Sequence, residues 1–482
     1  MAFTLPTAGT DPKVATKGDL ETNINSELDK KANIITGYSD DYDVILTGAD
    51  GFGGAAFGEN KADLGPLSIE MTDAGRFMVM GADKFIIGEL AYLSDTDADP
   101  EAALSAAAVV PYVGENIYAV EGEVFDLFAA GMLADRGNVD SVRFSLQSGQ
   151  GYSVAGTEVL RVDADSLGDT AYIQARRIND TGGTFPEIIM DCYTATKSPV
   201  SGASPTIISI GDSITYRSGT AWAGWYLEEW GYTPSFVGTL LSLEETLDGD
   251  TAARQGDEGR PGHTLQDMTY DVTTRVSPVA SGDEATYLAL DTTNRRLKNP
   301  FLRLSTGSDD AEDIYNGYVV DFAFYVSRFG YAAPDILWHG YGTNDIRDVP
   351  YDELEDKIFE LDSLIYRRWH LDYPTKPVVR FLPGTNWETD RNEVWNSGYI
   401  PAIRGMMRAA KAATGPVLLI PTWAMHTADG GYDLERVDAP DAVTGATMRT
   451  LEDLHPTGAT RRGLFKAVAA GLACASTANY GA

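Results

Sequence analysis

The sequence predicts an α/β domain with a parallel sheet over residues 204–482, preceded by β-rich modules. In this part of the chain, short and nearly continuous apolar segments alternate with longer helical segments. The apolar segments are TIISIG, DILWHGYG, PVVRFLPG and PVLLIPTW. Apolar strands that alternate with helices are typical of a parallel sheet covered by helices on both faces. Such sheets bind ligands at the carboxyl ends of their strands, so we expect site residues just after a strand.

The first residues of the chain are polar and contain one short amphipathic pattern. Leu20, Ile24 and Leu28 recur near helical spacing among acidic residues and lysines. A helix this short buries its apolar stripe either against its own chain or against copies of itself in a small coiled coil. Residues 1–40 are therefore predicted to form an attachment or oligomerisation segment.

Two β-rich modules are predicted next. Residues 41–113 alternate short apolar runs with glycine and aspartate, which indicates short strands joined by tight turns. Residues 114–197 carry apolar runs with two-residue alternation, which is typical of a small antiparallel β-sandwich. Neither module contains a cluster of histidine, cysteine and paired carboxylates, so both are predicted to be structural or adhesive. Residues 197–205 are rich in Ser, Pro and Gly and are predicted to be a linker.

The charge balance argues against a nucleic-acid partner. The chain has 71 acidic and 37 basic residues, which gives a net charge of −34. This charge repels a phosphate backbone and indicates a strongly solvated surface.

Cysteine content and hydropathy argue against a disulfide framework and a membrane span. Cys192 and Cys474 are the only two cysteines in the sequence. The N-terminus lacks the basic start and apolar run of a secretory signal, and no apolar stretch reaches the length of about 18 residues that a membrane span needs. We therefore expect a protein that is made in the cytosol, with no membrane partner.

Gly211-Asp212-Ser213 follows the apolar segment TIISI and precedes a helical segment. A glycine permits a sharp turn there, and the serine is presented at the end of a strand near a helix N-terminus, which suits a nucleophile. The same tripeptide is also ordinary turn chemistry with a helix cap. The pentapeptide Gly-x-Ser-x-Gly of α/β-hydrolases is absent at this position.

Two further loops carry candidate oxyanion donors. Asn344 lies in Gly-Thr-Asn-Asp after the segment DILWHGY, where its side chain can donate toward an oxyanion formed at the neighbouring strand. The alternative is that this tetrapeptide only starts the next helix. Gly262 lies in Gly-Arg-Pro-Gly-His, where a glycine brings a backbone N–H close to a substrate, although such loops are common.

The candidate base is His455, which lies before the last helical segment. A neutral imidazole takes a proton from a serine hydroxyl, and a carboxylate on its other nitrogen fixes its tautomer and orientation. Glu452 and Asp453 lie three and two residues upstream and are both candidates for this carboxylate. An extended loop favours Asp453, and a turn favours Glu452. His370 ends a long helical segment and is predicted to be a surface cap residue.

The motifs GDSIT, GRPGH, GTND and EDLHP, in this order, resemble the SGNH (GDSL-like) hydrolase family. The resemblance covers about 204–478, and the segment NPFLRLSTG to YAAPDI resembles an insertion in carbohydrate-esterase-like members. It implies a flavodoxin-like three-layer α/β/α fold without metal or cofactor. It also implies Ser213 as nucleophile, His455 as base, and an oxyanion hole made by the Ser213 N–H, the Gly262 N–H and the Asn344 side chain. The family acid is usually Asp three residues before the histidine, and Glu452 occupies that position here.

The resemblance implies a serine esterase, and the family favours removal of acetyl groups from a polysaccharide. Aromatic residues near the motifs are candidates for stacking on sugar rings, and they are Tyr216, Trp222, Trp338 and Tyr341. The polar N-terminus, the β-rich modules and the C-terminal esterase together resemble a phage tail fibre or tailspike. The expected partners are then an acylated polysaccharide, copies of the chain in a trimer, and other proteins of the virion tail. The alternatives are a stand-alone bacterial carbohydrate esterase exported by a non-classical route, and a non-catalytic adhesive protein.

Overall fold

The computed structural model divides the chain into two units, Met1–Ala107 and Ala108–Ala482. It describes residues 61–63, 68–71, 77–80, 86–90, 113–134, 142–177, 187–199, 203–269, 276–382, 394–425, 434–436, 448–450 and 455–480. The helix predicted within residues 1–40 lies outside the described residues.

The first unit contains a four-stranded antiparallel sheet with the strand order β1-β2-β3-β4. Its strands are β1 (Lys61–Asp63), β2 (Ser68–Met71), β3 (Phe77–Met80) and β4 (Ile86–Leu90). All four fall within the range 41–113, for which the sequence predicted short strands.

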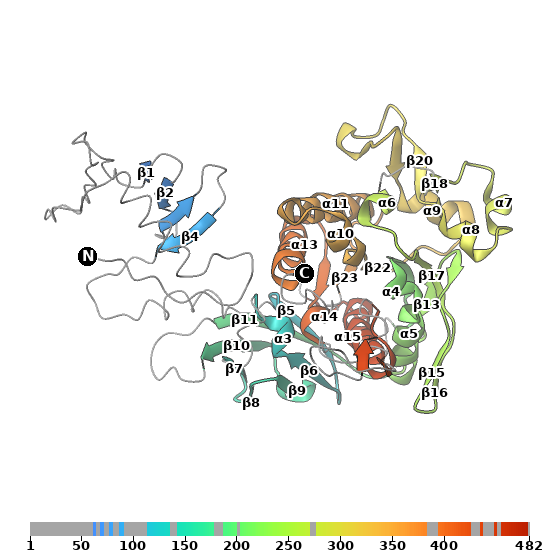
Figure 1. The fold of residues 1–482 in the computed structure, drawn as a ribbon. Coiled ribbons are helices and arrows are strands. Elements are labelled where there is room, and N and C mark those ends of the chain that lie inside the picture. The colour runs from blue at the N-terminus through green and yellow to red at the C-terminus, as the bar shows by residue number, and fades with distance from the viewer. Residues whose placement is uncertain are drawn as a thin grey trace, which may run out of the picture. The chain divides into compact units, whose positions relative to one another are not determined.

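The second unit begins with a module of β-strands, drawn in cyan and teal in Figure 1. Its elements are β5 (Asn116–Val120), β6 (Val124–Phe128), α3 (Ala129–Met132), β7 (Val142–Ser148), β8 (Ser153–Gly156), β9 (Val159–Asp163), η2 (Ala164–Ser166), β10 (Thr170–Arg177) and β11 (Glu187–Ala195). Five strands form one sheet in the order β5-β11-β10-β7-β8, and β6 pairs with β9. All these pairs are antiparallel except β5 with β11. The alternation of buried and exposed residues along β7 shows that one face of this sheet is part of the core.

The rest of the second unit is built on a parallel sheet. Its strands are β12 (Thr206–Gly211), β13 (Ser235–Val237), β14 (Leu240–Leu241), β17 (Gly256–Gly259), β22 (Ile336–Gly340), β23 (Val378–Phe381) and β24 (Val417–Ile420). The strand order is β14-β17-β12-β22-β23-β24. On one side of β12, β13 pairs with the first half of β12 and β17 pairs with the last residues of β12. Only β14 is antiparallel to its neighbour. With the short β17 left out and β13 counted second, the other five parallel strands follow the flavodoxin-like order 2-1-3-4-5.

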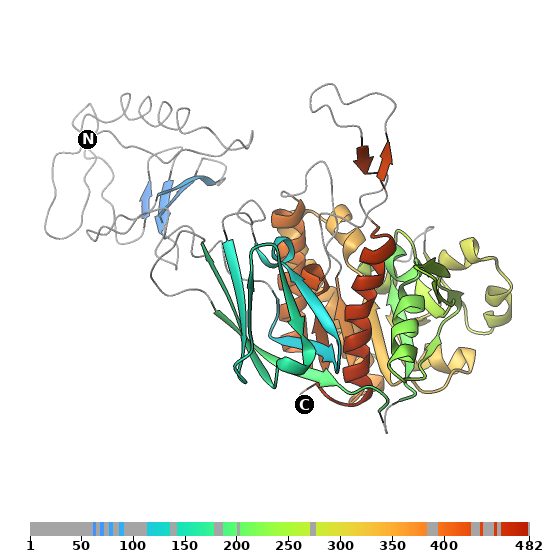
Figure 2. The same ribbon diagram turned by 90° about the horizontal axis from the view of Figure 1, so that it is seen from below.

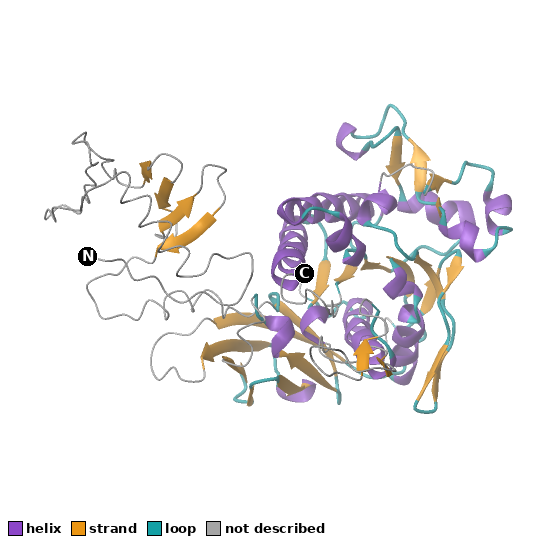
Figure 3. Ribbon diagram, viewed as in Figure 1, coloured by secondary structure: helices purple, strands orange, loops and turns teal. Residues whose placement is uncertain are grey.

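Helices cover both faces of this sheet, as Figures 1 and 3 show, so the predicted three-layer α/β fold is confirmed. The long helices are α5 (Gly219–Glu229) and α15 (Gly458–Ser476) on one face, and α11 (Tyr351–Asp372) and α13 (Ile400–Ala412) on the other. In α11, buried apolar residues recur every three or four positions, which is the pattern of a helix with one face on a core.

The remaining elements are short and occur along the chain between the strands and long helices named above. The helices are α4 (Ser213–Tyr216), α6 (Leu265–Thr269), α7 (Glu284–Leu288), α8 (Thr292–Arg296), η3 (Ala311–Asp313), α9 (Phe322–Phe329), α10 (Thr343–Asp348), η4 (Val394–Tyr399) and α14 (Thr422–Met425). The strands are β15 (Glu245–Leu247), β16 (Asp250–Ala252), β18 (Ser277–Pro278), β19 (Lys298–Asn299), β20 (Leu302–Leu304), β21 (Tyr318–Val320), β25 (Leu434–Arg436) and β26 (Met448–Thr450).

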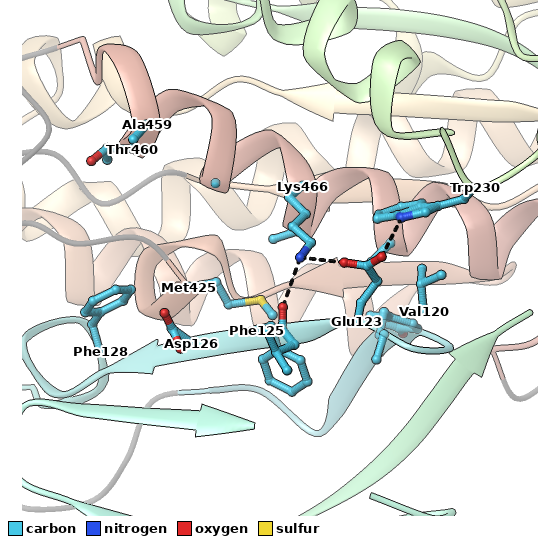
Figure 4. A pocket seen from close by; sticks show the side chains of 16 residues that line it. Val120, Glu123, Phe125, Asp126, Phe128, Trp230, Met425, Ala459, Thr460 and Lys466 are labelled. Carbon is cyan, nitrogen blue, oxygen red and sulfur yellow. Dashed lines mark hydrogen bonds and ion pairs between the residues drawn. The ribbon is translucent and has the colours of Figure 1, made fainter. Parts of the chain in front are cut away.

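The β module and the α/β part pack against each other through α15, as Figure 2 shows. This helix is buried almost all round because it contacts β22, β23 and β24 on one side and β5 and β11 on the other. Glu123 forms an ion pair with Lys466 of α15 at 2.7 Å and accepts a hydrogen bond from Trp230 Nε1 at 3.2 Å. Figure 4 shows these contacts beside an apolar cavity of about 360 Å³. The start of the predicted linker is attached to the end of α5, because Ser198 N donates to the carbonyl of Trp230 at 2.7 Å.

Candidate active site

Three neighbouring strands of the parallel sheet end at the same level. In the register of the sheet, Gly211 of β12 lies beside Gly259 of β17 and beside Gly340 of β22. Each strand is followed by a loop or by the start of a short helix that carries one residue predicted for the site. These residues are Ser213, Gly262 and Asn344. The topology therefore brings three sequence motifs to one edge of the sheet, where α/β proteins bind their ligands.

Ser213 is the first residue of α4 and lies directly after β12. The carboxylate of Asp212 caps this helix by accepting a hydrogen bond from Ile214 N at 2.9 Å. A Cβ atom on Gly211 would lie 2.1 Å from Thr215 Oγ1, so the close approach of helix and strand requires glycine. The N–H of Ser213 lies in the first turn, where backbone N–H groups have no acceptor within the helix. This N–H is therefore a suitable donor to a substrate oxygen.

His455 contacts Ser213 although the two residues are 242 positions apart. The distance from His455 Nε2 to Ser213 Oγ is 2.6 Å, which is a short hydrogen bond, and both side chains are buried. Arg461 holds the segment of His455 and Pro456 in place. Its Nε donates to the carbonyl of Pro456 at 2.7 Å, and its Nη1 pairs with Glu245 at 3.2 Å. The pair has the geometry that a base needs to take the proton of a serine hydroxyl.

Glu452 and Asp453, the two candidate acids, lie outside the described residues. The choice between them therefore stays a prediction. His455 itself is described, and its position before Pro456 and α15 agrees with the loop that the sequence predicted.

The two loops with predicted oxyanion donors are tied together. Asn344 Nδ2 donates to the carbonyl of His263 at 2.9 Å, and Leu265 N donates to the carboxylate of Asp345 at 3.1 Å. Gly262 adopts a φ of 78°, a left-handed conformation that favours glycine. An amide nitrogen has two hydrogens, so Asn344 can hold the His263 carbonyl and donate to a substrate oxygen at the same time.

A buried ion-pair network lies beneath the loop that carries Asn344. Arg380 donates to Asp362 Oδ2 at 3.0 Å, and His339 Nε2 lies 2.9 Å from Asp362 Oδ1. Burial alone would raise the pKa of Asp362, but the positive charge of Arg380 and the contact with His339 hold it below its ordinary value. Arg380 Nη1 also donates to the carbonyl of Tyr341 at 2.6 Å. The network thus fixes the start of the loop, and it positions Asn344 without contacting a substrate.

A second buried pair supports the loop that carries Gly262. Arg260 pairs with Glu258 at 2.5 Å, and both side chains are almost fully buried. Glu258 also accepts hydrogen bonds from Tyr325 at 2.5 Å and from Thr239 N at 2.6 Å. Tyr325 belongs to α9. This helix therefore helps to position the oxyanion loop.

Sequence reasoning did not single out either buried network. The available signal was a charged residue within an apolar strand or next to one, such as Arg380 in PVVRFLPG. Buried charges are almost always paired, so each of them predicted a partner. The identity of the partner required the tertiary structure, since Asp362 lies on α11.

The prediction that His370 is a surface residue is wrong. The side chain is 6% exposed, and a Cβ on Gly415 would lie 2.5 Å from its ring. The ring is therefore packed beneath the turn that follows α13. It lies at the C-terminal end of α11, as the sequence indicated.

Most of the aromatic residues considered for sugar stacking belong to the core. Trp222, Trp338 and Tyr341 have no exposed surface. Tyr216 is half-buried, and the guanidinium of Arg296 lies 3.8 Å from the centre of its ring. Tyr216 is therefore the one candidate among these four that a substrate can still reach.

His455 should remain a neutral base at acidic pH. Burial lowers the pKa of His455 well below its ordinary value, and the positive charges of Arg217 and Arg461 lower it further. We expect kcat/KM for 4-nitrophenyl acetate to stay constant as the pH falls to about 6.5 and to decline only below it. Arg217→Gln removes a positive charge and should move the decline to higher pH. Arg161→Gln, at an exposed position of the β module, should leave it in place, and a decline above pH 6.5 in the unmodified protein would contradict this assignment.

The described part of the chain contains no group of three or more His, Cys, Asp or Glu side chains that could hold a metal ion. Within the same residues, no helix combines the length and the apolar character needed to span a bilayer. Cys192 and Cys474 are buried free thiols.

No family model and no curated protein matches the sequence. Among solved structures, a carbohydrate esterase family 3 from Talaromyces cellulolyticus is similar, with 16% identity and a TM-score of 0.31 over 55% of this chain and 94% of that chain. An acetyl esterase mutant with an acetate ion has 16% identity and a TM-score of 0.30 over 55% and 92%. A carbohydrate acetylesterase from Xanthomonas citri has 9% identity and a TM-score of 0.29 over 77% and 74%. At these low values the chemistry follows from the side chains of the site and not from the likeness.

Proposed function

We propose that this protein is a serine esterase. The observation that carries the proposal is the 2.6 Å contact between His455 Nε2 and Ser213 Oγ, at the strand edge where the loops of Gly262 and Asn344 also lie. Nucleophile, base and oxyanion donors at one site are the parts that acyl transfer requires.

In the proposed reaction, Ser213 Oγ attacks the carbonyl carbon of an ester while His455 takes the hydroxyl proton. The carbonyl oxygen becomes an oxyanion, which accepts hydrogen bonds from the N–H groups of Ser213 and Gly262 and from the side chain of Asn344. The tetrahedral intermediate then expels the alcohol, which receives the proton from His455, and an acyl-serine remains. Water attacks the acyl-serine with His455 again as base, and the acid leaves as Ser213 regains its proton.

The proposed substrate is an O-acetyl ester on a surface polysaccharide, and the proposed setting is a tail fibre or tailspike of a virion. The supporting features are the β module packed on the esterase and the amphipathic pattern within residues 1–40. The proposed assembly is a trimer that is attached to other virion proteins. A stand-alone carbohydrate esterase and a non-catalytic adhesive protein are the alternatives.

The test is the release of acetate from O-acetylated bacterial surface polysaccharides, measured by an acetate-specific assay. We expect release from at least one acetylated polysaccharide, and none from the same polymer after alkaline de-O-acetylation or with the Ser213→Ala protein. Hydrolysis of 4-nitrophenyl acetate without any acetate release would leave an esterase with a different substrate. Absence of both activities would favour the adhesive alternative, and a monomer by light scattering would remove the support for a fibre.

A further inference from the structure

Strands β15 and β16 form a short hairpin that lies beside α5 (Figure 1). The two strands pair in antiparallel register, and Asp248 and Gly249 form the turn between them. Both turn residues have positive φ, 55° and 92°, as a two-residue turn of type I′ requires. A turn of this kind fixes the register of the strands, and the register decides which side chains share a face of the hairpin.

One face of this hairpin is turned toward the helices. Thr246 and Thr251 are paired and exposed, and their hydroxyl oxygens lie 2.9 Å apart. The next pair along the strands is Glu245 with Ala252, and both of these residues are buried or half-buried. Successive side chains of a strand point to opposite faces, so the carboxylate of Glu245 points toward the helices.

Glu245 joins two helices that cover the same face of the parallel sheet. Its Oε2 accepts a hydrogen bond from Trp222 Nε1 of α5 at 2.7 Å, and its Oε1 pairs with Arg461 Nη1 of α15 at 3.2 Å. The side chains of Glu245 and Arg461 are only 20% and 12% exposed. The loss of one partner of a charge pair that is largely removed from water has a larger effect than the loss of a surface pair.

Arg461 connects Glu245 to the segment of the catalytic base. Its Nε donates to the carbonyl of Pro456 at 2.7 Å, and the preceding residue is His455, whose Nε2 lies 2.6 Å from Ser213 Oγ. A guanidinium is planar and rigid, so the carboxylate at Nη1 also sets the direction in which Nε donates. A displacement of about 1 Å at a reacting group can cost about 10²-fold in rate, so this orientation matters for proton transfer.

The charge of Glu245 favours the same proton transfer. His455 becomes an imidazolium when it takes the proton of the serine hydroxyl. Burial lowers the pKa of His455, and the positive charges of Arg217 and Arg461 lower it further, so they disfavour the imidazolium. The carboxylate of Glu245 lies against the guanidinium of Arg461 and offsets part of that positive charge.

A second ion pair between the hairpin and α15 offers a comparison. Asp250 of β16 pairs with Arg462 at 2.5 Å. The guanidinium of Arg462 lies 4.4 Å from the centre of the Trp225 ring, and its Nε donates to Tyr226 Oη at 3.3 Å. Both aromatic residues belong to α5. Arg462 therefore joins the hairpin to α5, whereas Arg461 joins it to the segment of the catalytic base.

We propose that Glu245 is a positioning residue of the esterase reaction and acts on His455 through Arg461. It orients the guanidinium that holds the carbonyl of Pro456, and it thereby keeps the imidazole at the Ser213 hydroxyl. Glu245 itself contacts neither the substrate nor the reacting atoms. The inference rests on the proposed function, because it concerns the base of that reaction.

The test measures kcat and KM for 4-nitrophenyl acetate at neutral pH, together with the thermal midpoint, on the full-length chain. The variants are Glu245→Ala, which removes both contacts, and Glu245→Gln, which keeps the size of the side chain and removes its charge. Asp250→Ala is the matched control, because it breaks the other ion pair between the same hairpin and the same helix. Glu244→Ala is a second control, because it removes an exposed carboxylate next to Glu245.

We expect Glu245→Ala to lower kcat by about 10- to 100-fold and to change KM by less than about twofold, since the base is displaced and the substrate site is kept. Glu245→Gln should lower kcat by about fivefold or more, since an amide oxygen still accepts a hydrogen bond but offsets no charge. Asp250→Ala and Glu244→Ala should keep the kcat of the unmodified protein.

A double variant separates positioning of the base from a general structural role. In the His455→Ala background, Glu245→Ala should lower the residual rate by less than about twofold, because a residue that acts through the base has no effect once the base is absent. A structural role predicts the same loss of rate in both backgrounds.

Three results would overturn the proposal. They are a kcat within about twofold of the unmodified protein in Glu245→Gln, an equal loss of kcat in Asp250→Ala, and an undiminished effect of Glu245→Ala in the His455→Ala background. Glu245→Gln decides the case if Glu245→Ala does not fold at the assay temperature. If the unmodified protein hydrolyses no ester, the proposed function fails and this inference fails with it. Failure in the variants alone leaves the proposed function intact.

Discussion

Ser213→Ala and His455→Ala should each lower kcat/KM for 4-nitrophenyl acetate by about 10³-fold or more. The nucleophile and its base act as one unit, so the loss of either removes the covalent route. The 2.6 Å contact between Nε2 and Oγ places the base directly at the hydroxyl whose proton it takes. The measurement is steady-state hydrolysis at neutral pH, with the rate of the uncatalysed reaction subtracted.

Ser235→Ala is a matched control for this experiment, because Ser235 is exposed on β13 and lies outside the site. Its activity should equal that of the unmodified protein. The double variant of Ser213 and His455 should be no slower than either single variant, as expected for residues that act together. If Ser213→Ala or His455→Ala keeps activity within a few fold while the thermal midpoint is unchanged, the altered residue has no part in the reaction.

Asn344→Ala should lower kcat by about 10² to 10³, with a smaller change in KM. The substitution removes one oxyanion donor while nucleophile and base remain, and such a loss typically costs about 2.7 to 4 kcal/mol of transition-state stabilisation. Asn344 Nδ2 also donates to the carbonyl of His263, so the loop that carries Gly262 loses one hydrogen bond to the Asn344 segment. The hydrogen bond between Leu265 N and Asp345 should keep the loops together.

Asn294→Ala is the control for this substitution, because Asn294 is exposed on α8. It should leave both kcat and KM unchanged. A loss in Asn344→Ala that appears only in KM would mean that the side chain binds substrate and transition state equally, which contradicts an oxyanion role. A loss that is explained by a large drop in the thermal midpoint would place Asn344 in the structure of the loop instead.

The arrangement of the α/β part could be predicted from the sequence because the signals are local. Apolar strands such as TIISIG alternate with helices, and each motif residue follows a strand directly. In a parallel sheet, strand ends on one edge are neighbours, so Ser213 and Asn344 were expected near each other. The register of Gly211 with Gly340 gives the physical basis for that expectation.

Other features depended on contacts between distant parts of the chain. The Ala-rich helix α15 is buried on most sides from Leu464 onward only because the β module packs on the side that faces away from the parallel sheet. Arg380 and Glu258 have partners on other elements, such as Asp362 and Tyr325, and no local sequence pattern identifies these partners. The assignment of the acid to Glu452 or Asp453 rests on the sequence alone.

The sequence by itself determined the α/β class, the loops after the strands and the residue types that the site requires. These features depend on helix and strand periods and on turn residues, which involve residues close together in the sequence. Only the tertiary structure decided which distant side chains meet. It placed His455 2.6 Å from Ser213 across 242 positions, and it paired Arg380 of β23 with Asp362 of α11. The physical reason is that strand register and the pairing of buried charges depend on how whole elements pack, and a one-residue shift in register would change every such contact.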